Sequence, residues 1–534
     1  MKEVLYFNGD ILTMEEELYT ESILVKGDKI YRVGKKDYLI KFCNKDTILY
    51  DLKGKTLMPS FIDSHSHFLG YANSLLQVAL DDAKNFNDIE YKIKKFINKN
   101  NIEKGEWIIA KGYDNNFLEE KEHPSKYILD KISLENPIVI QHKSGHMGVL
   151  NSKALEELNI TKDTKSEDGG FIRRIKDSLE PDGYLEEISF ISILKKIPMN
   201  SFDRFKNAVI EANKLYASYG ITTAQEGFII KGMDNILNLI KDLKLLKIDL
   251  IGYIDVKESE EMKESFKSSI KKYNNNFKLL GYKIFLDGSP QGRTAWMLEP
   301  YENSKDGYKG YPIYKDYEVE RSIEIAIKDN MQILAHCNGD AAIDQYINQY
   351  KIAKEKSSKN NEIRPVIVHA QFLKEDRLKE VKELNMIPSF FIAHVYHWGD
   401  VHVENLGIER AKNISLANSA LKNDIKFTFH QDAPVIEPNM IETIWCAVNR
   451  ITKSNKVLGE EEKIDVLDAL KAITINGAYQ YFEENIKGSI KENKLADLVI
   501  LNDNPLKIEK EKIKDIKVLE TIKAGETIFK SKLY

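Results

Sequence analysis

Two histidines separated by one residue follow a short apolar run. The apolar pair Phe61-Ile62 is followed by Asp63-Ser-His65-Ser-His67. Side chains two positions apart in a strand point to the same face, so His65 and His67 can direct two imidazoles at one point. Neutral imidazole is the commonest metal ligand in proteins, and zinc takes nitrogen donors at about 2.0–2.1 Å. The pair alone does not exclude two ordinary histidines at a strand end, so other residues must decide.

Four further groups that could complete a metal site lie in or after apolar strand-like runs later in the chain. They are Lys283 in GYKIFLDGS, His336 in MQILAHCNGD, His369 in RPVIVHAQ and Asp432 in IKFTFHQDAP. Taken singly, His336 can be a hydrogen-bonded core histidine, Lys283 a lysine whose stem crosses apolar surface, and Asp432 the cap of a turn. Taken together, a buried lysine, a buried aspartate and four unligated histidines would be costly in one place. The set therefore predicts a metal site.

The elements that must position these groups are short apolar strands that alternate with helices. Eight such strands are expected, beginning near Pro59, Gly220, Ile248, Gly281, Met331, Arg364, Met386 and Ile425. Alternation of strand and helix predicts parallel βα units, and eight units fit an α/β fold of the closed (β/α)8 or TIM barrel type. In such barrels the catalytic groups come from the carboxyl ends of several strands and meet at one mouth.

The two ends of the chain lack this alternation of strands and helices. Residues 1–57 and 482–534 consist of short strand-like runs separated by turn signals such as Asn8-Gly9 and Lys53-Gly54. Neither end has enough strands to cover a hydrophobic face, so one small β-sandwich built from both termini is expected beside a barrel domain at 58–481. The first two barrel strands are about 150 residues apart. Residues 70–210 are therefore predicted to be an insertion over the active site.

Composition excludes several classes of protein. The chain of 534 residues has 42% hydrophobic and 30% charged residues with a net charge of -5, so neither nucleic acid nor an anionic membrane is expected as a partner. There is no secretory signal and no run of about 18 uncharged apolar residues. Three distant cysteines, Cys43, Cys337 and Cys446, indicate a reducing compartment, and we expect the cytoplasm. We expect a small-molecule substrate and leave a homodimer open.

Several motifs, taken together, are highly specific. They are MPSFIDSHSHF, SGHMGVLNSKAL, KIFLDGSPQGRTA, AHCNGDAAID, VHAQ and HQDAPV, followed by GSIKENKLADLVIL near the end. The pattern resembles the metal-dependent amidohydrolase superfamily over nearly the whole chain, and the finer motifs resemble the branch that contains N-substituted formamide deformylase.

The resemblance implies a centre of two divalent metal ions, with zinc favoured. Six ligands are implied: His65 and His67 on the more buried metal, Lys283 as a carboxylated bridge, His336 and His369 on the second metal, and Asp432 on the first. A carbamate on Lys283 is physically reasonable because it is an anionic bridge, whereas a free ammonium would be repelled by two cations.

The implied reaction is hydrolysis of a C–N bond in a small amide, formamide, urea or cyclic amide through a metal-bridging hydroxide. Two metals about 3.5–4 Å apart polarise a carbonyl and lower the pKa of the bridging water. Asp432 would be the catalytic residue that takes the proton and passes it to the leaving nitrogen.

Substrate contacts are expected from groups around this centre. His430 stands where relatives usually carry a small residue, and it shares a strand face with Asp432. The loop AHVYHWGDVH adds further histidines, whereas Cys337 should face away from the site. Asn151 is expected to cap a helix. The predicted substrate-binding residues are His146, Asp287, Arg293, His397 and His430.

Two alternatives stay open. One is a mononuclear deaminase of the same superfamily, which usually has a glutamate near the histidine of the fifth strand; His336 is followed instead by Cys-Asn-Gly-Asp. The other is a metal-free binding protein on the same barrel. Bound metal per chain separates the three hypotheses, at about two, one or none.

Overall fold

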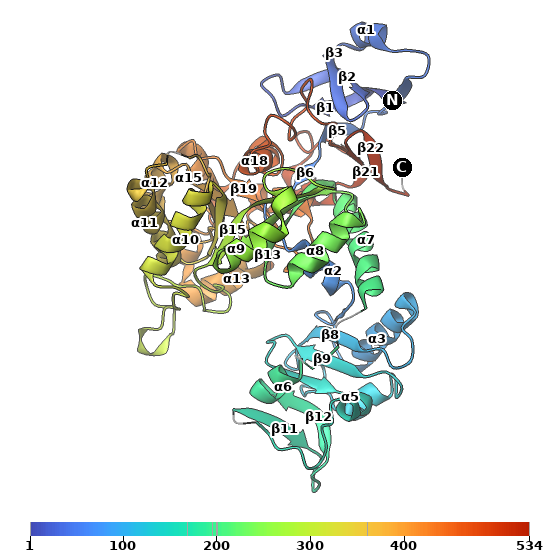
Figure 1. Cartoon of the computed structure of the whole chain (residues 1–534), viewed down its shortest axis with the longest axis vertical. Coiled ribbons are helices and arrows are strands. Elements are labelled where there is room, and N and C mark those ends of the chain that lie inside the picture. Colours follow the sequence, from blue (N-terminus) through green and yellow to red (C-terminus); the bar gives the residue numbers. More distant parts are fainter. Residues whose placement is uncertain (1, 168, 195, 199–200, 360, 533–534) are drawn as a thin grey trace. The chain divides into compact units, whose positions relative to one another are not determined.

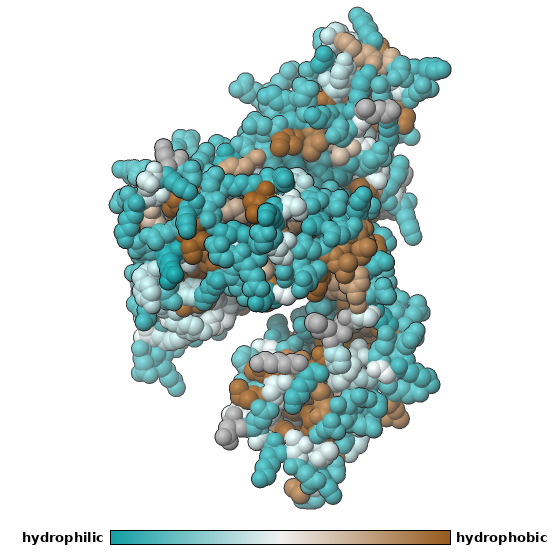
Figure 2. All heavy atoms as spheres, viewed as in Figure 1, coloured by the Kyte–Doolittle hydropathy of each residue, from teal (hydrophilic) through white to brown (hydrophobic). Residues whose placement is uncertain are grey.

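The computed structural model describes residues 2–167, 169–194, 196–198, 201–359 and 361–532. The chain forms two compact units (Figure 1). The first comprises Met1–Gly70 together with Ile210–Tyr534, and the second comprises Tyr71–Val209. Hydrophilic residues dominate the face shown in Figure 2, where hydrophobic residues gather in small groups.

A sheet of eight parallel strands dominates the first unit, and its strands are hydrogen-bonded in chain order. They are β6 (Phe61–Ile62), β13 (Ile221–Ile229), β14 (Asp249–Asp255), β15 (Phe277–Phe285), β16 (Gln332–Cys337), β17 (Val366–His369), β18 (Ile387–Phe390) and β19 (Thr428–Phe429). The predicted α/β class and its eight parallel strands are confirmed. After the edge strands, the amide of Asp432 donates to the carbonyl of His65 at 3.2 Å, and that of His67 donates to Ala433 at 2.8 Å.

Helices separate the parallel strands, as the alternating pattern predicted. The main ones are α7 (Phe202–Ser218), α8 (Met233–Asp242), α10 (Asp316–Asp329), α11 (Asp340–Lys356), α12 (Leu378–Glu383), α13 (His394–Leu406), α16 (Met440–Asn449), α17 (Val466–Ala472) and α18 (Ile475–Gln480). One buried cluster contains alternate residues of the strands, such as Ile251 with Tyr253 and Val366 with Val368. Alternate residues share one face of a strand, so this cluster fills one side of the sheet with apolar side chains.

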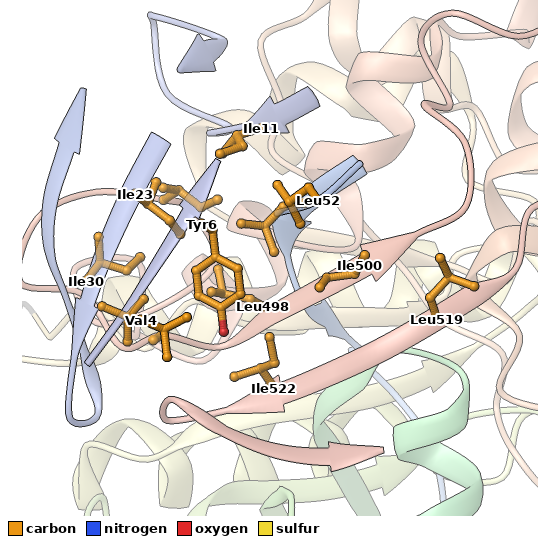
Figure 3. Packing of buried hydrophobic residues seen from close by; sticks show 14 residues of the cluster. Val4, Tyr6, Ile11, Ile23, Ile30, Leu52, Leu498, Ile500, Leu519 and Ile522 are labelled. Atoms are coloured by element: carbon orange, nitrogen blue, oxygen red, sulfur yellow. The ribbon is translucent and has the colours of Figure 1, made fainter. Parts of the chain in front are cut away.

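Strands from both ends of the chain share a second sheet, in the order β22-β21-β20-β5-β1-β2-β3, with β4 beside β1. They are β1 (Glu3–Leu12), β2 (Tyr19–Lys26), β3 (Lys29–Gly34), β4 (Ile48–Asp51), β5 (Thr56–Pro59), β20 (Leu498–Leu501), β21 (Val518–Lys523) and β22 (Glu526–Lys530). Tyr6 and Ile23 pack in one apolar cluster with Leu498 and Ile522 (Figure 3). Strands from both ends of the chain are thus hydrogen-bonded in one continuous sheet.

The second unit has a six-stranded sheet of its own, in the order β11-β12-β10-β9-β8-β7. Its strands are β7 (Val78–Ala79), β8 (Ile108–Tyr113), β9 (Ile138–His142), β10 (Met147–Leu150), β11 (Gly170–Arg174) and β12 (Pro181–Glu186). Helix α3 (Phe86–Asn100) buries Ile89 and Ile93 in the core of this unit. Within the described residues, no helix of the chain has both the length and the apolar character needed to cross a bilayer.

Buried charges connect the parallel sheet to the terminal sheet. Asp249, the first residue of β14, accepts hydrogen bonds from Lys487 and from Lys523, the latter at 2.7 Å. Burial raises the pKa of Asp249, but the two ammonium groups outweigh burial and lower the pKa to about 2. The ionised carboxylate therefore favours the folded state.

We expect Asp249→Asn to lower the free energy of unfolding by about 3–5 kcal/mol, because two buried ammonium groups lose their shared counter-charge. In the wild-type chain the folded pKa is below the unfolded value of about 3.9, so this stabilisation is present above pH 4 and is lost as the pH falls toward 2. Denaturant unfolding between pH 2 and 7 measures it. Equal acid sensitivity in the variant and the wild type would contradict the assignment.

Candidate metal centre

Three of the predicted ligands lie together at the carboxyl ends of the edge strands. His65 and His67 follow β6, and Asp432 follows β19. The ligand atoms of these three residues all lie within 4.8 Å of one another. Asp432 Oδ1 is 3.5 Å from Nε2 of His65 and 3.5 Å from Nε2 of His67. The backbone of Asp432 is left-handed, with φ 53°, at the point where its amide meets the carbonyl of His65.

The carboxylate of Asp432 is only partly satisfied by the protein. Its Oδ1 is buried and has no hydrogen-bond partner among the described residues. Burial raises the pKa of Asp432 to about 6, against the opposing effects of His67 and Lys283. A buried carboxylate oxygen without a partner is unfavourable unless a cation or a proton compensates it.

Lys283 contacts the same group through His65. It is fully buried on β15, and its Nζ is 3.2 Å from Nε2 of His65. Burial lowers the pKa of Lys283 to about 7, although Asp432 acts in the other direction. Burial therefore favours the neutral amine of Lys283 over the ammonium form.

The other predicted histidines form a chain of contacts beside this group. His336 Nδ1 is 3.0 Å from His369 Nε2, and His369 Nδ1 is 3.1 Å from His430 Nε2. His369 Nε2 is also 3.9 Å from Asp432 Oδ2. Burial lowers the pKa of His336 to about 3 and that of His369 well below its ordinary value. Neutral imidazole is the form that binds metals.

His430 lies on the protein side of His369. It is fully buried, and its Nδ1 is 2.9 Å from Ser389 Oγ. Both of its nitrogens therefore face protein groups, Ser389 on one side and His369 on the other. These hydrogen bonds do not test the predicted contact of His430 with substrate.

Two residues of β13 that sequence reasoning missed support the paired histidines. His65 Nδ1 donates to Gln225 Oε1 at 2.6 Å, and the Gln225 amide donates to Tyr481 Oη at 3.1 Å. His67 Nδ1 is 3.7 Å from Glu226 Oε1. Gly227 leaves room for the His65 ring, because a Cβ there would lie 2.6 Å from Cε1. The signal was the run TTAQEG, in which polar residues lie inside a strand and are all buried.

Asp287 connects two loops at this end of the sheet. Its carboxylate accepts hydrogen bonds from the amides of Trp296 at 3.0 Å, Asn338 at 3.0 Å and Gly339 at 2.7 Å. Burial raises the pKa of Asp287 to about 7, although these donors oppose it. The carboxylate of Asp287, predicted to bind substrate, thus bonds to backbone amides, and it fixes the loop that directly follows β16 and His336.

The remaining predicted contacts bond to other side chains. Arg293 Nε donates to Asn405 Oδ1 at 2.8 Å, and His397 Nε2 is 2.8 Å from Glu442 Oε1. His146 belongs to the second unit, where Nδ1 is 3.1 Å from an oxygen of Glu187. None of these three belongs to the compact ligand group found among the described residues.

Asn151 and Cys337 are both buried. Asn151 caps α5 (Ser152–Glu157) by accepting from the amide of Ala154 at 2.9 Å, as predicted. Cys337 is fully buried and pairs in register with His369 across β16 and β17. Burial raises the pKa of the Cys337 thiol well above its ordinary value, which disfavours a nucleophilic thiolate.

The structure thus has a parallel α/β sheet with candidate metal ligands at the carboxyl ends of its strands, which is where such folds carry their catalytic groups. The chain belongs to the Amidohydrolase family, whose family model matches residues 49–529. The resemblance inferred from the motifs is confirmed.

Relatives of the chain match it over most of its length. It is 28% identical to protein LONG AFTER FAR-RED 3 of Arabidopsis thaliana, over 94% of this chain and 87% of that protein. It is 25% identical to the putative amidohydrolase YtcJ of Bacillus subtilis, over 99% of both chains. It is 23% identical to N-substituted formamide deformylase of Arthrobacter pascens, over 98% of both chains.

Solved structures support the same fold. An uncharacterized metal-dependent hydrolase from Pyrococcus horikoshii has a TM-score of 0.77 and 24% identity, over 95% of this chain and 99% of that chain. Another from Pyrococcus furiosus has a TM-score of 0.77 and 22% identity, over 95% of this chain and 100% of that chain.

Proposed function

We propose that the protein is a metal-dependent amidohydrolase that cleaves a C–N bond in a small amide, formamide, urea or cyclic amide. The observation that carries the proposal is the grouping of His65, His67 and Asp432, with one buried carboxylate oxygen left without a partner. Membership of the Amidohydrolase family and the similarity to N-substituted formamide deformylase support the bond class. We also propose that the eight strands close into a TIM barrel.

The side chains fit a divalent metal. Gln225 accepts from Nδ1 of His65, so the other nitrogen of that ring is left facing Asp432. Metal-binding histidines commonly use one nitrogen for the metal and donate the other N–H to the protein. His65, His67 and Asp432 would hold one ion, and Lys283, His336 and His369 would complete a two-metal site in which zinc is favoured. The bound metals would supply Lewis-acid polarisation of the substrate carbonyl and a water of lowered pKa.

The chain supplies the proton transfers. Asp432 has a pKa raised to about 6, so it can accept a proton during attack and return it to the leaving nitrogen near neutral pH. The neutral amine of Lys283 would attack the carbon of carbon dioxide, form the N–C bond and release one proton to give an anionic carbamate. A reducing, cytoplasmic setting agrees with the free thiols of Cys43, Cys337 and Cys446.

A mononuclear deaminase is the second candidate. The observation in its favour is that the compact ligand group within the described residues has three members and does not include His336 or His369. Metal content separates the candidates, at about two ions per chain for the first and one for the second.

The test is alanine substitution of the paired histidines. We expect His65→Ala or His67→Ala to lose metal and hydrolytic activity together, because each removes one nitrogen ligand from the group. Metal per chain is measured by mass spectrometry, and activity is measured on N-formyl, N-acyl, ureido and cyclic amide compounds.

The matched control is His146→Ala in the second unit, which is expected to change the substrate profile and keep the metal. Normal metal content and turnover in either His65→Ala or His67→Ala would refute the proposal. Metal loss in His146→Ala would refute the ligand assignment.

Gln225 provides an independent check. We expect Gln225→Leu to weaken metal affinity by about 10–100-fold, because the ring of His65 loses the acceptor that orients it. Gln225→Glu keeps an acceptor and should retain more affinity. Competition with a chelator measures the effect, and Gln345→Leu controls for loss of a buried amide, since Gln345 bonds to Tyr314 and Asp316 in another part of the unit. Equal affinity in Gln225→Leu and wild type would exclude this role.

A further inference from the structure

A large cavity lies at the other end of the parallel strands. Its volume is about 990 Å³. Asp249, Lys278 and Gln332 line it, and each belongs to the first two residues of its strand, β14, β15 or β16. The candidate metal ligands lie near or just after the carboxyl ends of their strands, so the cavity and the candidate metal centre are separate sites within the first unit.

The acidic residues of the cavity wall already have cationic partners. Asp249 pairs with Lys523 at 2.7 Å, and Glu483 pairs with Lys487 at 3.2 Å. Two acids nearer the surface are also paired, Glu362 with Arg364 at 3.1 Å and Glu526 with Lys2 at 3.7 Å. These carboxylates therefore contribute little uncompensated negative charge to the cavity.

Four lysines of the wall have no such compensation. They are Lys244, Lys247, Lys271 and Lys272, and all four are exposed. Their amines have no ion pair and no hydrogen bond with any described residue. Burial alone shifts the pKa of Lys271, downward, with no carboxylate acting against it. One side of the cavity thus carries a concentration of free positive charge.

The wall also presents apolar surface. Leu246, Leu280 and Ile363 are buried in it, whereas Phe482 and Ile486 remain 37% and 47% exposed. The guanidinium of Arg364 covers the ring of Phe482 at 4.4 Å. Ligand sites typically combine such apolar walls with a few charged groups in a volume of about 300–1,000 Å³.

We propose that this cavity binds a small organic anion that carries at least two negative charges and a flat apolar group. The charges would lie among the four free lysines, and the apolar group would cover Phe482 and Ile486. An inorganic ion would leave the apolar wall in water, and a neutral ligand would leave the ammonium groups uncompensated. The proposal does not depend on the hydrolytic function.

Naphthalene-1,5-disulfonate is a suitable ligand for the test, because it is a flat dianion whose sulfonates bind divalent metals poorly. Titration calorimetry with the metal-loaded full-length protein should show one saturable site. Affinity should fall by about tenfold or more in Lys271→Gln/Lys272→Gln and in Lys244→Gln/Lys247→Gln, and should fall with added salt. Ile486→Glu should also weaken binding, because it places a negative charge on the apolar wall.

Two controls locate the site. Lys41→Gln/Lys45→Gln removes two exposed charges from another surface and should bind like the wild type, and so should His67→Ala, which removes a metal ligand. Naphthalene-1-sulfonate, with one charge, and inorganic sulfate should both bind more weakly. The proposal is overturned if the wild-type protein does not bind the disulfonate at millimolar concentration, or if both cavity double variants bind it as tightly as the wild type. It is also overturned if His67→Ala loses binding, or if inorganic sulfate binds as tightly as the disulfonate.

Discussion

Lys283→Ala is expected to lose most hydrolytic activity and to regain part of it when formate or acetate is added. The missing group in the proposed enzyme is a small carboxylate on a buried amine, and its removal leaves a cavity at this point of β15. A small carboxylate can enter that space and take the position of the carbamate. Turnover is measured with and without formate at fixed metal concentration.

The matched variant is Lys283→Arg, which keeps a positive charge and fills the space. It should be inactive and should not respond to formate. Activity of Lys283→Ala close to that of the wild type would contradict the role of the side chain. An unmodified lysine turned away from two bound metals in a crystal structure would rule out the carbamate.

Asp432→Asn is expected to reduce turnover by about 10²–10⁴-fold, the usual contribution of a positioned acid or base. An amide can still occupy the ligand position, so part of the metal should remain, but it cannot accept the proton. Turnover and metal content are measured on the same preparation.

The pH profile gives a second measurement for this residue. Burial raises the pKa of Asp432, so protonation should remove wild-type activity as the pH falls through the acid range, and this limb should be absent in Asp432→Asn. A loss of less than tenfold would mean that another group is the base. His430 would then be the next residue to test, although its nitrogens lie 2.9 Å from Ser389 and 3.1 Å from His369.

The paired histidines could be predicted because their relation is local. A strand repeats every two residues, so the spacing of His65 and His67 alone places both side chains on one face. The approach of Asp432 follows from the expected parallel strands, whose carboxyl ends meet at one edge. The supporting role of Gln225 depends instead on the register of β13 against β6, in which Ile221 pairs with Phe61. A shift of one residue would turn Gln225 away from His65, and no local pattern fixes that register.

The same limit applies to Asp287 and to the terminal sheet. From the sequence, Asp287 is predicted to contact substrate. In the structure its carboxylate bonds instead to the backbone amides of Trp296, Asn338 and Gly339. Turn signals predicted the hairpins at each end of the chain, but not the parallel pairing of β1 with both β4 and β5. Hydrophobic periodicity describes each segment by itself and does not indicate which distant segments pair.

The place of β5 in the terminal sheet has a consequence for the order in which the chain can assemble. All four residues of β5 are buried, and it lies between β1 and β20. During synthesis the second edge of β5 cannot be paired until the segment that begins at Leu498 has left the ribosome, because that segment is its partner strand. Such distant pairing is slow to form, and an unpaired apolar edge is prone to aggregation while it waits. Protection of β5 in a nascent chain therefore depends on β20, a strand that is synthesised much later.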